Sequence, residues 1–194
     1  MNYDYLQAIF WSLAYILIIV YNIRYKTLGI PVISISSNFA WETVALINDI
    51  KSNSLDLIHV IWIALDVLIV ITYFIFCEPL YTKHKFPLLL LYLIEVIVFL
   101  IVFGRNNGML LSSFVIDLTM AIEYLINSLN KKLKFNYVLF AIFVTKLFGD
   151  LCAWLYYKDF DNQVLLIGII VLLLNSASTA IVSIRIRKHF QNDA

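Results

Sequence analysis

Five acidic residues interrupt the apolar segments of this sequence, at depths where a membrane-spanning helix normally carries apolar side chains. A carboxylate at the centre of such a helix costs about 2.5–3.5 kcal/mol on insertion scales, so it usually faces a polar interior. Burial disfavours the charged form of a carboxyl group, which makes a buried acid a candidate proton donor. The sequence therefore predicts acid–base chemistry inside a helical bundle, involving the acids Glu42, Asp66, Glu95, Asp117 and Asp150.

Glu42 and Asp66 have no basic residue at helical spacing on their own segments. Each must be neutral, paired with another helix or hydrated, and a functional role is favoured for both. Lys146 and Asp150 are instead four residues apart, which is one helical turn. They form either a structural ion pair or a base in which the lysine holds the acid ionised, and both interpretations stay open. Glu123 is interpreted as structural.

Tryptophans neighbour several of these acids. Trp41 precedes Glu42, and Trp62 lies one turn before Asp66. Aromatic faces stabilise a positive charge by about 0.5–2 kcal/mol each, so the pattern favours an aromatic cavity for an apolar or cationic molecule. The alternative is an interfacial aromatic belt, which suits Trp154 better than the two deeper tryptophans.

Seven long apolar runs must position these residues. Hydrophobic residues make up 62% of the 194 residues and charged residues 14%, which indicates a polytopic membrane protein and gives no sign of nucleic-acid binding. Each run has about the 20 residues needed to cross a bilayer. We expect an all-α protein with seven transmembrane helices, at approximately residues 6–22, 28–49, 57–79, 86–103, 108–129, 135–157 and 163–184.

The basic residues between the runs predict the orientation. Under the positive-inside rule, the N-terminus lies outside and the C-terminus lies in the cytoplasm. Counting about 1.5 Å per residue from the outer boundaries places all five acids roughly 10–14 Å deep, in one layer below an outward-opening cavity. The predicted cytoplasmic side holds Arg24, Lys26, Lys83, Lys85, Lys131, Lys132, Lys134, Arg185, Arg187 and Lys188, against Lys51, Arg105 and Lys158 on the other side.

The organisation expected is a single domain over residues 1–194, with the first apolar run retained as a helix. Cys77 and Cys152 fall near opposite ends of their helices, which excludes a disulfide, and no histidine or cysteine spacing suits a metal. The chain is rich in Ile, Asn and Lys and has short loops, which suggests a bacterial protein and therefore a location in the bacterial cytoplasmic membrane.

One stretch of the chain resembles the second-helix signature of the integral-membrane terpene cyclases known from fungal meroterpenoid and indole diterpene pathways. The strongest part is Asn38-Phe39-Ala40-Trp41-Glu42, preceded by Tyr21-Asn22-Ile23-Arg24-Tyr25 and Gly29-Ile30-Pro31. Weaker similarities are Trp62-x-x-x-Asp66 and Thr145-Lys146-Leu147-Phe148-Gly149.

The resemblance implies a cyclisation that starts with protonation of a terminal epoxide or alkene on a prenyl chain, with Glu42 as the acid. A second family acid, an Asp in the last helix, aligns with Asn175. Because an amide cannot donate a proton as an acid does, either Asp66, Asp117 or Asp150 supplies that role, or the chain does something else. Neither Asp-Asp-x-x-Asp nor Asp-x-Asp-Asp occurs, so no metal or other cofactor is expected.

The expected substrate is a prenylated or polyprenyl lipid-like molecule within the bilayer, and the sequence does not predict an oligomeric state. A small-solute transporter is the main alternative, since a polar layer among seven helices also suits transport, and a non-catalytic membrane partner is a third. The predicted catalytic residues are Glu42, Asp66 and Asp150, and the predicted substrate-binding residues are Asn38, Trp41, Trp62, Glu95, Asp117, Lys146 and Asn175.

Overall fold

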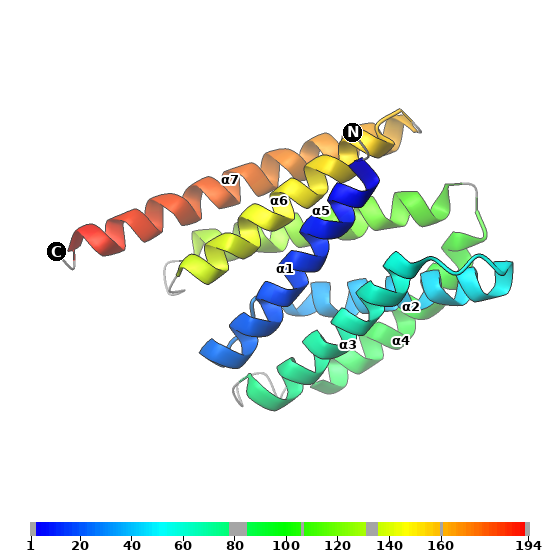
Figure 1. Ribbon diagram of the computed structural model, residues 1–194, viewed down its shortest axis with the longest axis horizontal. Coiled ribbons are helices and arrows are strands. Elements are labelled where there is room, and N and C mark those ends of the chain that lie inside the picture. Colours follow the sequence, from blue (N-terminus) through cyan, green and yellow to red (C-terminus); the bar gives the residue numbers. More distant parts are fainter. Residues whose placement is uncertain (1–2, 78–84, 106, 131–135, 160, 193–194) are drawn as a thin grey trace. The chain divides into compact units, whose positions relative to one another are not determined.

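The computed structural model describes residues 3–77, 85–105, 107–130, 136–159 and 161–192, which form seven α-helices and no strand (Figure 1). The predicted all-α fold with seven helices is confirmed. The helices are α1 (Tyr3–Tyr25), α2 (Val32–Ser52), α3 (Leu57–Phe76), α4 (Lys85–Phe103), α5 (Gly108–Leu129), α6 (Tyr137–Tyr157) and α7 (Asn162–Asn192).

The end of each helix follows from local chemistry. Pro31 is extended (φ −59°, ψ 145°), so α2 begins after it and not at residue 28 as predicted. At the other end Asn53 adopts the left-handed conformation (φ 51°) and stops the helix. Asp56 accepts a hydrogen bond from the backbone N–H of Ile58 at the start of α3, and Asn136 caps α6 in the same way.

Six of the seven described helices are long and apolar enough to cross a membrane. The one outside this group is α2, which carries Glu42, Asp49 and Lys51 besides several serines. Its side chains Ser34, Ser36, Glu42 and Asp49 are buried in the protein, which explains how so polar a helix belongs to a membrane protein.

The predicted integral membrane protein is thereby confirmed, whereas the orientation stays a prediction. Several of the basic residues that support this orientation, Lys83, Lys131, Lys132 and Lys134, lie outside the described residues.

The chain divides into two compact units. The first comprises Met1–Leu17 and Asp117–Ala194, in which α6 and α7 pack side by side (Figure 1). The second comprises Ile18–Ile116, in which α2 packs against both α3 and α4. The single-domain organisation stays a prediction.

Asn22 fixes the start of the second unit. Its side chain is fully buried, its Nδ2 donates to Thr72 Oγ1 at 3.2 Å, and its Oδ1 accepts from the backbone N–H of Gly29 at 2.9 Å. One amide therefore joins the end of α1, the following loop and α3 by hydrogen bonds shielded from solvent. This contact gives the asparagine of the Tyr21–Tyr25 stretch a structural role.

Candidate active site

Glu42 lies in the interior of the second unit. It is 2% exposed, and its Oε2 is buried with no hydrogen-bond partner among the described residues. The neighbours that act on it electrostatically are all acids, Asp66 most strongly and then Asp49 and Asp56. No counter-ion compensates this carboxyl group in the described part of the unit, so its position is not explained by an ion pair.

Asp66 approaches α2 from α3. Asn38 Nδ2 donates a hydrogen bond to Asp66 Oδ2 at 2.9 Å, and Asp66 is 4% exposed. Because Asn38 precedes Glu42 by one helical turn, this contact holds Asp66 on the same side of α2 as Glu42. The predicted site residues Asn38, Glu42 and Asp66 are thus brought together. Of the three possibilities given above for Asp66, neutral, paired with another helix or hydrated, the structure shows a partner on another helix.

Trp41, which precedes Glu42, contacts side chains of three other helices. Its Nε1 donates to Ser112 Oγ on α5 at 3.0 Å, and its ring meets Phe103 edge-on at a centroid distance of 5.6 Å. The Trp41 ring also contacts His59 at 5.8 Å, and the Trp62 ring contacts the same histidine at 6.4 Å. Both predicted tryptophans therefore meet at His59, which sequence reasoning missed because only α2 and α3 together create this contact.

Glu95 of α4 is hydrogen-bonded to two serines of α2. Ser36 Oγ donates to its Oε2 and Ser37 Oγ to its Oε1, each at 2.5 Å. Since both carboxylate oxygens bind α2, Glu95 joins α4 to α2, and a substrate contact stays a prediction. The two serines could not be selected from the sequence, since a serine within an apolar run shows no helical periodicity of its own.

A second cluster of predicted residues lies in the first unit, around Asp150. Lys146 Nζ is 2.6 Å from Asp150 Oδ2, and Asn175 Nδ2 donates to that oxygen at 2.5 Å. All three side chains are 2–3% exposed, while Asp150 Oδ1 is buried without a hydrogen-bond partner among the described residues. Asp117 lies near enough to interact electrostatically with both Asp150 and Lys146. The ion pair predicted from the four-residue spacing is present.

Trp11 completes this cluster, although sequence reasoning did not select it. Lys146 Nζ lies 5.0 Å from the centroid of its ring, within the range of a cation–π interaction. The ring approaches α6 closely because Gly149 has no side chain: a Cβ there would lie 2.8 Å from Trp11 Cδ1. The glycine thus permits the contact between Trp11 and the lysine.

Gly149→Ala should therefore destabilise the protein by about 1–3 kcal/mol, the usual cost of overpacking a filled interior. The rigid indole must move, and Lys146 loses its aromatic contact. The measurement is thermal unfolding in detergent. The matched control is Gly104→Ala, where a Cβ would be 3.5 Å from the nearest atom, the backbone oxygen of Ile101. Equal unfolding temperatures for the two variants would contradict the packing argument.

The structure thus groups the predicted residues into two clusters, one around Glu42 and Asp66 and one around Asp150. The predicted single layer of five acids draws on both units and stays a prediction. Within the described residues, no group of three or more His, Cys, Asp or Glu side chains is arranged to hold a metal ion, and Cys77 and Cys152 are free.

Fold and site define an integral membrane protein of the polytopic α-helical class, with buried carboxyl groups beside aromatic side chains. Within that class, the chain belongs to the Pyr4-like transmembrane terpene cyclases, whose family model matches residues 3–131. No curated protein and no solved structure matches the chain.

The family resemblance predicted from the sequence is confirmed, and membership implies a lipid-like prenyl substrate in a membrane setting. The matched region includes Glu42 and Asp66, whereas Asp150 and Asn175 lie beyond it. Bacterial origin and the bacterial cytoplasmic membrane stay predictions.

Proposed function

We propose that the protein is an enzyme that cyclises a prenyl or epoxyprenyl chain, and that Glu42 donates the initiating proton. The observation that carries this proposal is the almost complete burial of Glu42 with an unpartnered carboxyl oxygen, next to the fixed ring of Trp41. A buried carboxyl group without a counter-ion favours its neutral form, which is the form that can give a proton. Family membership supports the same chemistry.

The proposed reaction is balanced as an isomerisation. Glu42 transfers its proton to the epoxide oxygen, the adjacent C–O bond breaks, and a carbocation forms. The π electrons of successive double bonds make the new C–C bonds and move the positive charge along the chain. A base finally removes a proton from carbon and restores one double bond. Trp41 and Trp62 would stabilise the moving cation through their ring faces.

Two acids are candidates for the base. Asp66 belongs to the same unit as Glu42 and is bound by Asn38. Asp150 belongs to the other unit, and Lys146 provides the positive charge that would keep it ionised. The amide of Asn175, where the family resemblance leads one to expect an acid, donates to Asp150 and so supports its carboxylate form. No cofactor is assigned.

The test is to incubate the purified protein in lipid vesicles with farnesol, geranylgeraniol and their terminal epoxides. We expect a product of unchanged mass, because one proton enters the substrate and one leaves it. The product should have fewer double bonds, because their π electrons form the new C–C bonds. Mass spectrometry and NMR would identify it. Transport instead predicts accumulation of an unaltered solute inside the vesicles, and that outcome without any isomeric product would contradict the proposal.

A further inference from the structure

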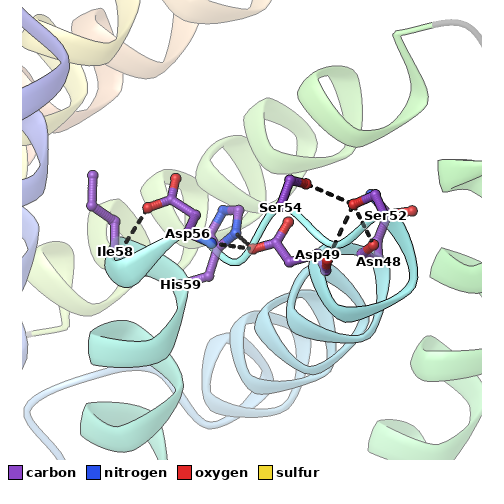
Figure 2. A network of polar contacts seen from close by, with 7 residues as sticks. All are labelled: Asn48, Asp49, Ser52, Ser54, Asp56, Ile58 and His59. Atoms are coloured by element: carbon purple, nitrogen blue, oxygen red, sulfur yellow. Dashed lines mark hydrogen bonds and ion pairs between the residues drawn. The ribbon is translucent and has the colours of Figure 1, made fainter.

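A polar network joins α2 to α3 at the turn between them (Figure 2). Asp49 Oδ2 lies 2.7 Å from His59 Nδ1 and also accepts a hydrogen bond from the backbone N–H of Asp56 at 3.2 Å. Nearby, Ser52 Oγ donates to the backbone oxygens of Asn48 and Asp49. Asp56 is the N-cap of α3, and the Ser52 hydrogen bonds lie within the last turn of α2, but neither feature requires a histidine against Asp49.

Burial increases stepwise from this turn towards Glu42. Ser52 and Asp56 are exposed, the side chains of His59 and Asp49 are 12% and 10% exposed, and Glu42 is 2% exposed. Asp49 follows Glu42 by seven residues, which places both on the same face of α2 two turns apart. The imidazole therefore lies at an intermediate depth between the exposed turn and the buried acid.

His59 also contacts the aromatic ring that precedes Glu42 in the sequence. Its ring lies 5.8 Å from that of Trp41, the residue immediately before Glu42. The charged groups between the α2–α3 turn and Glu42 are the carboxylates of Asp49, against the imidazole, and of Asp56, which accepts from the Ile58 N–H. Both act electrostatically on Glu42, together with Asp66. Negatively charged carboxylates attract protons to this part of the protein. An imidazole side chain can in general pass protons on near neutral pH.

We infer that the Asp49–His59 pair resupplies the proton that Glu42 gives to the substrate. This inference rests on the proposed function. After donation, the Glu42 carboxylate accepts a proton from the His59 imidazolium, directly or through water. The neutral imidazole then takes a proton from water at the α2–α3 turn, while the contact with Asp49 orients the ring. One proton enters per turnover, and the final deprotonation of the substrate releases one.

The test follows proton exchange at Glu42 itself and needs no substrate. The full-length protein in vesicles is transferred into deuterated buffer, and time-resolved infrared spectroscopy follows the carboxylic acid band of Glu42, identified by its loss in Glu42→Gln. We expect His59→Gln, which can still donate to Asp49, to slow this exchange by at least about tenfold, because it cannot carry a proton. Added imidazole should restore much of the rate.

Ser54→Ala is the matched control, since Ser54 belongs to the same turn, is exposed, and its hydroxyl bonds Ser52 Oγ at 2.7 Å and not the imidazole. Its exchange rate should equal that of the unaltered protein. Asp49→Asn provides a second variant, because its amide oxygen can still accept from the Asp56 N–H while the carboxylate that faces the imidazole is lost. It should also slow exchange.

The outcomes separate this inference from the proposed function. Unchanged exchange in His59→Gln and Asp49→Asn would overturn the proton route and leave Glu42 as the acid. Slow exchange that imidazole does not restore would also overturn it, since that result indicates a structural role for the pair. An unaltered protein without any Glu42 carboxylic acid band would overturn the proposed function, and the inference with it.

Discussion

Glu42→Gln should lower the formation of cyclised product by at least about a hundredfold, the lower end of what general acid catalysis contributes. The amide preserves the size of the side chain but has no acidic proton to give. Because Glu42 Oε2 has no hydrogen-bond partner among the described residues, the replacement disrupts no contact at that atom. The loss should therefore fall on turnover and not on folding, and product yield per unit of folded protein is the quantity to measure.

Glu123→Gln is the matched control for this experiment. It makes the same chemical change on the membrane-spanning helix α5, at a partly buried position outside both clusters of predicted site residues. Product formation should stay close to that of the unaltered protein. Near-normal turnover in Glu42→Gln would exclude the proton-donor mechanism, even though the family assignment would be unaffected.

The helices could be predicted because the bilayer requires long apolar runs, and these runs are visible along a sequence without any tertiary information. The starting point of α2 was wrong because the hydrophobic pattern runs on through Pro31, whereas its extended backbone delays the helix to Val32. At the other end, α2 continues beyond residue 49 to Ser52, where Asn53 stops it in a left-handed conformation.

Contacts within the site could be predicted only where both partners lie on the same helix. Lys146 and Asp150 are one turn apart, so their spacing alone brings them together. The partners of Asp66 and Glu95 come from α2, and that of Asp150 includes Asn175 on α7. Such contacts depend on how neighbouring helices rotate and pack, which no spacing within one segment encodes.

The same limit explains the two aromatic contacts that sequence reasoning missed. Trp11 meets Lys146 only because Gly149 removes a side chain at the helix surface, and His59 meets Trp41 only because α3 returns beside α2. In both cases the sequence shows the residue but not its neighbour.

Lys146→Met should destabilise the protein by about 3–5 kcal/mol, because it leaves the buried carboxyl of Asp150 without its positive partner. Asp117 would add repulsion, since it interacts with both members of the pair. The double variant Lys146→Met with Asp150→Leu should recover much of that stability in thermal unfolding. Recovery should be incomplete, because the buried Asn175 amide then loses its acceptor at a cost of about 1–3 kcal/mol.

Adding Asn175→Leu to the double variant should remove that remaining cost. The three changes convert the cluster into an apolar interior, and such replacements are often neutral or stabilising. If the triple variant unfolds no later than the double variant, the hydrogen bond from Asn175 to Asp150 does not contribute as the structure indicates.

Turnover in the stable double variant then decides which acid is the base. If Asp150 accepts the final proton, the folded double variant should form less product by about a hundredfold or more, while Asp66→Asn keeps its activity. Asp66→Asn should fold, because its amide oxygen can still accept from Asn38 Nδ2. The opposite result, an active double variant and an inactive Asp66→Asn, would assign the base to Asp66. Lys146 and Asp150 would then be a structural ion pair, since a pair that only stabilises the interior can be replaced by apolar side chains without loss of activity.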